Sequence, residues 1–510
     1  MRLRPGRLAA FPLGALLLLA PGRARATDAE VTSDTAAQFY DVRSPTGETI
    51  LARRRLTTTL GVGAYELIDR EPGDVSSPDL SFRARVRYDA DYGISGGTVD
   101  HTNFGSFVPG VSQGAVDLMY AYLEGRRFLH GWLGFKLGRQ YVTDVLGWWS
   151  FDGGEVSATT PFFLKAEAYG GLEQRGGMPL STSRFESDGV WRGDRSQFDP
   201  SLYPQFQPAA VAPAIGVALE STGVTWIHGR LTYRRVYDTG ASNLTDYAGG
   251  LYTPAVYTGG RVSSEKLGYA VDASLAKLGG AKAGIVYDVY NAEVTSIYGT
   301  LDAYAGKRVV ISADYDYYVP TFDADSIWNF FAGEPMNDVG LRTTWDPTDK
   351  LSLAGGAHVR VYNVQTAPYN PGNGPAASSP NYSVTGTYYP SNGHPFDDGA
   401  NVSARWKTGE TTVTLRGSGN WGDEGDRVGA DVYAQHVFET RYVASARTGV
   451  WQWNDKLEPD RSATSFNYVL GLGYRFARRA QAMFEWEHDI NQLVGQRFRL
   501  MLWLTIAVTK

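Results

Sequence analysis

Few side chains in this chain are spaced for catalysis. The seven histidines are scattered, and the sequence indicates no His-Glu-x-x-His helix, no nucleophile elbow between a strand and a helix, and no phosphate-binding glycine loop. His488 follows Glu485 and Glu487 near the end of a predicted strand, where it could complete an acid–base cluster or simply lie at a rim. The sequence therefore predicts that the protein is not an enzyme.

Metal and cofactor sites are not indicated either. The chain contains no cysteine, which excludes disulfides, thiolate metal sites and the two-cysteine attachment of haem. Asp323 and Asp325 lie beside Trp328 in segment 319–334, which could form an inward plug, a sugar-stacking surface or an ordinary outer loop. Calcium between these carboxylates is a weaker hypothesis, since such a site needs about six or more oxygen ligands. We predict no metal and no cofactor.

The final segment shows the pattern that dominates the chain. Phe498, Leu502 and Val508 share one face while Arg497 and Arg499 share the other, because successive side chains of a strand point to opposite sides. A tilted strand of about ten residues can cross a bilayer. In lipid its backbone groups must be paired on both edges, and only a closed sheet provides this.

Segments of this kind recur through the chain, giving about twenty predicted strands between residues 52 and 508. Their connections alternate in length. The short ones are 277–280, 305–306, 347–349, 407–410 and residue 477, and the long ones are 175–210, 237–263, 319–334, 363–395 and 453–463. This asymmetry predicts an all-β fold, a transmembrane antiparallel up-and-down β-barrel of about 18 to 22 strands with short periplasmic turns and long outer loops.

The N-terminus predicts export. Arginines at positions 2, 4 and 7 precede an apolar run over 8–20, and small residues around Ala24 and Ala26 follow, as in a cleaved signal peptide over 1–26. We expect residues 27–50 to form a periplasmic lead-in and residues 51–510 to form a barrel in the outer membrane of a Gram-negative bacterium. The alternation of connections fails near residue 113, so either 35–43 is an additional strand or an N-terminal range is misassigned.

Basic side chains lie opposite the apolar face in many predicted strands. Arg83, Arg85 and Arg87 alternate with Phe82 and Val86, for example. The predicted pore-lining set is Arg83, Arg85, Arg87, Arg230, Arg234, Arg360, Arg405, Arg416, Arg447, Arg475, Arg497 and Arg499. Fewer acids share this face, namely Asp117, Asp272, Asp288, Asp314, Asp316, Glu485 and Glu487. The excess of bases predicts a net basic lumen that attracts anions. The alternative is that these bases pair with acids across strands and stiffen the wall.

One stretch resembles a known family. Tyr120–Glu124, Phe135–Gln140 and Trp148–Gly153 resemble the strand-loop-strand pattern of outer-membrane porins, and most of all the barrels of the alginate-export type. That group has a Gly-Arg-Gln strand end followed by a Phe-Asp-Gly strand start. The resemblance implies a polysaccharide conduit with a basic lumen and gating loops, and it carries over directly only Arg139 and Gln140. The chain departs from the group in lacking a terminal aromatic residue.

Three functions follow as hypotheses. The first is a conduit that exports a polar or anionic polysaccharide, with outer-membrane lipid and possible periplasmic export machinery as partners. The second is a passive diffusion porin for small, preferentially anionic solutes. The third is a structural or adhesive barrel, or an enzyme with its site in the outer loops. Nucleic acid is not expected as a partner, because 48 basic residues face 54 acidic ones.

Overall fold

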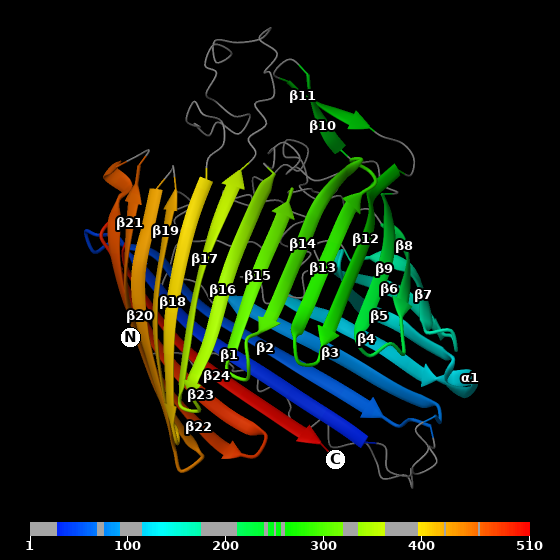
Figure 1. The fold of residues 1–510 in the computed structure, drawn as a ribbon, viewed down its shortest axis with the longest axis horizontal. Helices are drawn as coiled ribbons and strands as arrows, with labels where there is room; N and C mark the ends of the chain where they lie inside the picture. The colour runs from blue at the N-terminus through cyan, green and yellow to red at the C-terminus, as the bar shows by residue number, and fades with distance from the viewer. Residues whose placement is uncertain are drawn as a thin grey trace, which may run out of the picture.

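The chain folds into one closed antiparallel sheet of 22 strands, seen from the side in Figure 1. The computed structural model describes residues 28–68, 76–91, 115–174, 212–238, 243–248, 251–256, 261–319, 335–362, 396–422, 425–456 and 459–509. The barrel strands are β1 (Asp28–Arg43), β2 (Thr49–Tyr65), β3 (Asp79–Asp91), β4 (Ala115–Arg127), β5 (Leu133–Asp144), β6 (Gly147–Thr159), β7 (Leu164–Glu173), β8 (Pro213–Ser221), β9 (Ile227–Asp238), β12 (Arg261–Leu275), β13 (Gly279–Asp288), β14 (Glu293–Tyr304), β15 (Val309–Tyr318), β16 (Met336–Thr348), β17 (Leu351–Tyr362), β18 (Phe396–Thr408), β19 (Thr411–Gly422), β20 (Gly425–Phe438), β21 (Tyr442–Asp455), β22 (Ala463–Ala477), β23 (Ala480–Asn491) and β24 (Gly495–Thr509). The predicted barrel class is confirmed.

Each barrel strand pairs with its neighbours in the chain, and β1 closes the ring. Asp34 of β1 lies opposite Thr59 of β2 on one side and Thr505 of β24 on the other. The structure therefore differs from the predicted lead-in over 27–50, because 28–43 belong to the wall. The alternative that placed an additional strand near 35–43 accounts for the lost alternation, since β1 brings the strand number to an even value.

The two ends of the barrel differ in their connections. We call one the turn end, because it carries the short connections 276–278, 305–308, 349–350, 409–410 and 478–479, and the other the loop end. The chain enters β1 and leaves β24 at the turn end, as the even number of strands requires. The small hairpin of β10 (Asn243–Ala248) and β11 (Leu251–Val256) lies beyond the loop end (Figure 1).

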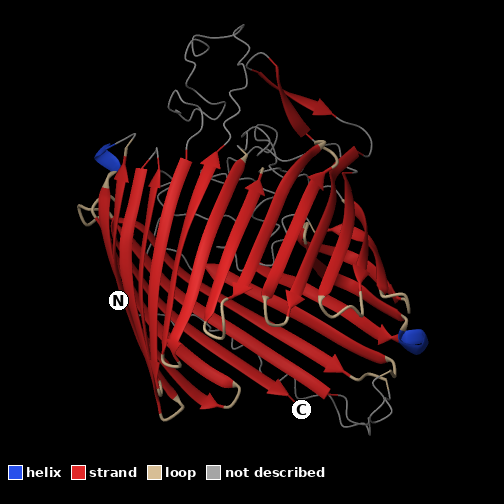
Figure 2. Cartoon of the chain, in the orientation of Figure 1, coloured by secondary structure: helices blue, strands red, loops and turns tan. Residues whose placement is uncertain are grey.

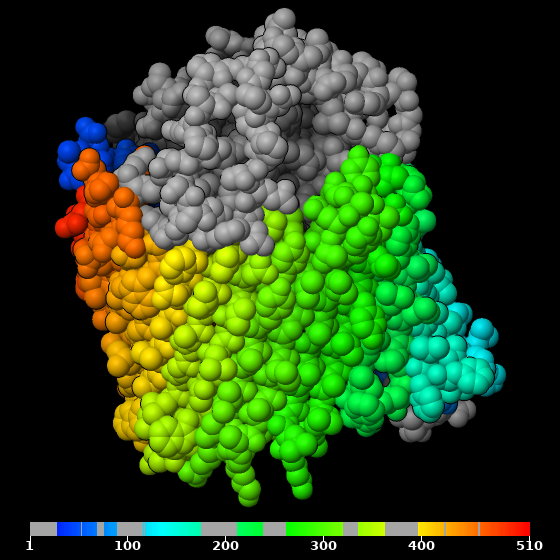
Figure 3. All heavy atoms as spheres, turned by 45° about the horizontal axis from the view of Figure 1, so that its top comes forward, coloured from blue at the N-terminus to red at the C-terminus, as the bar shows by residue number. Residues whose placement is uncertain are grey.

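The outer face of the wall is apolar. Antiparallel partners share a face, so exposed apolar residues on neighbouring strands form a continuous band around the barrel. Strands β12 to β18, green to yellow, form the wall in the foreground of Figure 3. Their exposed apolar residues include Leu267, Tyr269, Ile285, Leu301, Ile311, Val339, Leu341, Val359 and Val402, each at least 38% exposed. Leaving this area in water would forfeit about 25 cal/mol per Å². A bilayer around the barrel removes that cost.

Helical structure is slight in the described part of the chain (Figure 2). The segment α1 (Phe128–Gly131) is a turn between β4 and β5 in which Leu129 and His130 have positive φ, and the segment η7 (Pro459–Arg461) is one 3-10 turn. No helix among the described residues has the length and apolar character needed to span a bilayer. The predicted signal peptide, 1–26, and the residues Asp323 and Asp325 lie outside the described residues.

Candidate pore and its charged wall

The lumen-facing side of each strand follows from the exposed apolar residues opposite it. In β3, Phe82 and Val86 point outward and Arg83, Arg85 and Arg87 therefore point inward. The same alternation places all twelve predicted bases on the lumen side of the wall: Arg83, Arg85 and Arg87 on β3, Arg230 and Arg234 on β9, Arg360 on β17, Arg405 on β18, Arg416 on β19, Arg447 on β21, Arg475 on β22, and Arg497 and Arg499 on β24.

Half of these bases are held by carboxylates. The nearest N–O separations are 2.6 Å for Arg85–Asp34, 2.5 Å for Arg230–Glu167, 2.8 Å for Arg360–Asp338, 3.0 Å for Arg447–Asp431 and 2.5 Å for Arg497–Asp489, while Arg499 bonds Glu487. Several partners are shared, since Arg230 also bonds Glu220 at 2.6 Å and Arg497 also bonds Glu487 at 2.7 Å. Such pairs lock neighbouring strands together more than they attract solutes.

Sequence reasoning placed Glu487 on the lumen side but missed most of the other acids in these pairs. Glu167, Glu220, Asp338, Asp431 and Asp489 all lie on the lumen side, yet none belongs to the acids that sequence alternation placed there. The signal was present, because each follows the same two-residue period as its basic partner. The predicted excess of lumen bases is therefore smaller in the structure, and much of the wall is neutralised in pairs.

Three further bases lie against the wall. The guanidinium of Arg83 lies 5.3 Å from the centre of the Tyr65 ring, and that of Arg234 lies 5.2 Å from the Trp149 ring and donates to the Leu146 carbonyl at 3.2 Å. Arg87 is 2% exposed and engaged with neighbouring groups. These contacts limit how far the three side chains can reach toward a passing solute.

Arg405, Arg416 and Arg475 are different. All three are exposed on the lumen side, and within the described ranges no carboxylate approaches any of them to within 4.0 Å. Arg405 and Arg416 are diagonal neighbours on adjacent strands, because Arg405 pairs with Thr414 and Arg416 pairs with Ser403. Their charges are therefore open to the lumen, and they form a local electropositive strip on β18 and β19.

The resemblance motif has a structural role in the wall. Gly138 has φ of +126°, and a Cβ there would lie 2.3 Å from the Ala121 carbonyl oxygen. Pairing between β4 and β5 stops just beyond it, at Ala121 opposite Arg139. Arg139 bonds both oxygens of Asp152 at 2.7 Å and donates to the Leu118 carbonyl of β4 at 3.0 Å. Arg139 thus joins the two strands above the point where their ladder ends.

Gln140 faces the lumen side and is 1% exposed. Its amide donates to the Lys136 carbonyl at 3.4 Å and the Gly153 carbonyl at 3.3 Å. It lies opposite Phe151 of β6, which is completely buried. Neither motif residue is therefore free to contact a solute. Arg139 and Gln140, the two residues that match the family motif, belong to the packing of the wall and not to a cargo site.

The hairpin between β5 and β6 folds against the inside of the wall. Its tip, Val145 and Leu146, lies over β12, where a Cβ on Gly268 would be 2.4 Å from Val145 and 2.7 Å from Leu146. Behind the tip lies a buried cluster on the lumen side, made of Trp149, Phe151, Tyr169, Ala212, Ala214 and Val236. Sequence reasoning missed this cluster, whose signal was the pair of aromatic residues Trp149 and Phe151 at inward positions of β6.

The possible acid–base cluster at His488 does not form. Glu485 and Glu487 face the lumen with Arg499, whereas His488 lies on the opposite face and stacks on Phe498 with ring centres 4.3 Å apart. No set of three His, Cys, Asp or Glu residues in the described part of the chain is placed to hold a metal ion.

Comparisons with known proteins find likeness only among solved structures. No protein-family model and no curated protein matches the chain. The similar structures include Acinetobacter baumannii OccAB4 (8% identity, TM-score 0.43, covering 96% of this chain and 100% of that one) and OccAB1 (10%, 0.41, 96% and 98%). The Pseudomonas aeruginosa outer membrane protein OpdK gives 8% identity and a TM-score of 0.39, covering 94% and 99%. The expected likeness to alginate-export barrels finds no support here. At these values the comparison adds no argument to the strand pairing above.

Proposed function

We propose that the chain is an outer-membrane channel for passive diffusion of small solutes, with a preference for anions and with its turn end in the periplasm. The single observation that carries the proposal is the exposure of Arg405, Arg416 and Arg475 on the lumen side with no carboxylate within 4.0 Å in the described residues; Asp431, which lies opposite Arg416, is bonded to Arg447 instead. Unpaired charges of one sign in a low-dielectric channel concentrate counter-ions of the other sign.

A small solute fits this barrel better than a polymer. The β5–β6 hairpin and the aromatic cluster behind it occupy part of the space next to the wall. Most other charges there are engaged in ion pairs and offer no repeated binding surface along the wall. No contact among the described residues favours polysaccharide export or a periplasmic export machine.

Ion selectivity tests the proposal. The double variant Arg416→Gln/Arg475→Gln removes two open charges, so the chloride-to-potassium permeability ratio in planar bilayers should fall by about twofold or more. The measurement is the reversal potential under a KCl gradient. A wild-type channel without anion preference, or a double variant with an unchanged ratio, contradicts the proposal.

A charge-neutral pair provides the matched control. Arg342 bonds both oxygens of Asp314, at 2.9 and 2.8 Å, on the lumen side of β16 and β15. The variant Arg342→Gln/Asp314→Asn removes one charge of each sign, so the permeability ratio should stay close to that of the wild type. An equal loss of selectivity in this control would attribute the effect to altered packing.

A further inference from the structure

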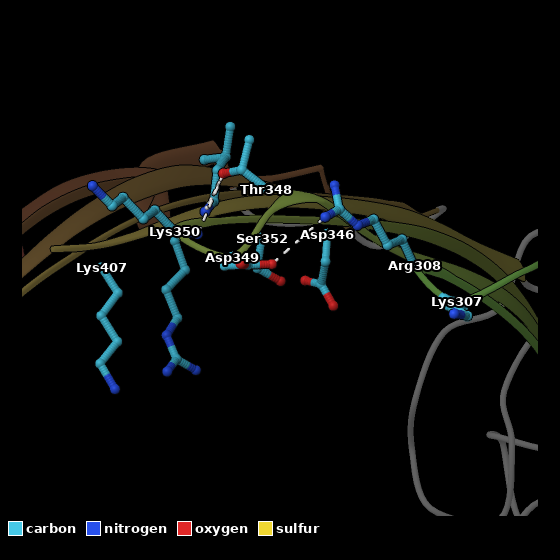
Figure 4. Close-up of a pocket in the computed structure, with 10 residues that line it drawn as sticks. Lys307, Arg308, Asp346, Thr348, Asp349, Lys350, Ser352 and Lys407 are labelled. Atoms are coloured by element: carbon cyan, nitrogen blue, oxygen red, sulfur yellow. Dashed lines mark hydrogen bonds and ion pairs between the residues drawn. The ribbon is translucent and has the colours of Figure 1, made fainter.

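A hollow of about 500 Å³ lies at the turn end of the barrel, at the bases of β14 to β18 (Figure 4). Two consecutive turns, those at 305–308 and 349–350, contribute to it together with the end of β18. Its volume falls in the range of roughly 300 to 1,000 Å³ typical of small-molecule sites. The strands that form it curve, and in the close-up Lys407 and Asp346 project from their concave side.

Positive charge dominates this hollow. Its lining contains five cationic side chains against two carboxylates: Lys307, Arg308, Lys350, Arg405 and Lys407 against Asp346 and Asp349. Arg308 is held in place, since it donates to the Pro347 carbonyl at 2.6 Å and lies 3.6 Å from Asp349. Within the described residues, no carboxylate comes within 4.0 Å of the other four cations.

The arrangement differs from ordinary solvated turns. In the turn between β20 and β21 one acid, Glu439, accompanies one base, Arg441. Here Lys307 and Lys350 come from two turns and Lys407 from the end of β18, and all three line one hollow with Arg405, so an anion bound in the hollow would be attracted by all four. The hydroxyls of Thr348 and Ser352 are also in the lining and can donate to an anion.

We propose that this hollow binds a small anion that carries two or more carboxylate or phosphate groups. A monovalent anion would leave most of the clustered charge unbalanced. The site lies at the mouth of the barrel and needs no preference for anions within the pore, so it goes beyond the function proposed above.

Calorimetry on the full chain in detergent tests the site with citrate and with tripolyphosphate as probes, and acetate as the monovalent comparison. The wild type should bind at least one multivalent probe and should bind acetate far more weakly. The triple variant Lys307→Gln/Lys350→Gln/Lys407→Gln should weaken binding by about tenfold or more, because three of the five cationic side chains that line the hollow are lost. The probe that binds more tightly identifies the carboxylate or the phosphate as the preferred group.

A second triple variant, Lys277→Gln/Arg441→Gln/Arg478→Gln, removes the same charge from other turns at the same end. It should weaken binding by no more than about twofold. Equal losses in the two triple variants, or no binding by the wild type, would overturn the site. If the first triple variant does not fold, the single variant Lys407→Gln replaces it and should weaken binding in the same direction. The reversal potential of the first triple variant under a KCl gradient measures the ion preference of the pore, separately from binding in the hollow.

Discussion

Charges on the lumen wall are organised around shared carboxylates. Glu487 is 5% exposed and receives bonds from both Arg497 and Arg499, while Arg497 also bonds Asp489 at 2.5 Å. A carboxylate this buried is costly without cations beside it, and two guanidinium groups together satisfy its oxygens. The pairing joins β23 to β24. Neutralising Arg497 or Arg499 would leave a buried carboxylate without one of its cations. Such a variant would destabilise the wall as well as change the charge of the lumen.

Arg139 has the same kind of structural role where β4 and β5 separate. Its guanidinium joins Asp152 of β6 to the carbonyl of Leu118 on β4, so it connects the strands where β4 and β5 no longer pair. The substitution Arg139→Gln should lower the free energy of unfolding by about 1 to 3 kcal/mol. Urea titration of the protein in lipid vesicles, followed by tryptophan fluorescence, measures this change.

Arg342→Gln is the comparison, since Arg342 makes a similar two-bond contact with Asp314 but is 61% exposed. An exposed pair contributes about 0 to 1 kcal/mol. If Arg139→Gln were no more destabilising than Arg342→Gln, the role of Arg139 between β4 and β5 would be wrong.

The β5–β6 hairpin is the element that the sequence could least foretell. Alternation predicted β5 and β6 as ordinary wall strands, because period two reports which face a residue takes and not whether a strand leaves the wall. The β5–β6 hairpin leaves the wall near Gly138, whose positive φ favours glycine. Its tip can approach β12 because Gly268 has no side chain there. Both effects are contacts between distant residues, and neither leaves a local pattern.

The contact at Gly268 can be tested with one added methyl group. In Gly268→Ala the Cβ would overlap Val145 and Leu146, so the hairpin tip should move away from the wall toward the pore axis. Single-channel conductance should fall as a result. Gly340→Ala on β16 is matched, since its nearest contact would be 3.7 Å away, and it should conduct as the wild type does. A Gly268→Ala channel of unchanged conductance would show that the hairpin does not limit flow.

At the scale of the whole molecule, the sequence predicted the barrel well but predicted its closing strand, β1, poorly. Every predicted strand range overlaps one barrel strand, because lipid on one side and polar groups on the other impose the same alternation throughout. β1 was anticipated only as an alternative over 35–43, because its segment has little contrast between faces, with Thr35 and Ala37 outside and Asp34 and Ala36 inside. Its place in the wall depends on pairing with both β2 and β24.

Closure can be tested in the middle of β1. Ala37 lies opposite Leu56 of β2 and Leu502 of β24, and proline there would remove a ladder hydrogen bond and distort the strand. Ala37→Pro should therefore reduce the folded fraction strongly, as measured by the heat-dependent shift in gel mobility typical of such barrels. Thr46→Pro, in the exposed turn between β1 and β2, is the control and should fold normally. Equal folding of both variants would mean that β1 is dispensable for closure.

Because β1 pairs with β24, the sheet closes on itself and neither β1 nor β24 is an edge strand. Glu30 lies opposite Thr509, so the two ends of the wall-forming chain are already neighbours. A short linker from residue 509 to residue 28 should therefore permit circular permutation, with a new break in the connection between β17 and β18. Such rearranged chains would reveal which hairpin must be synthesised first for the cylinder to assemble.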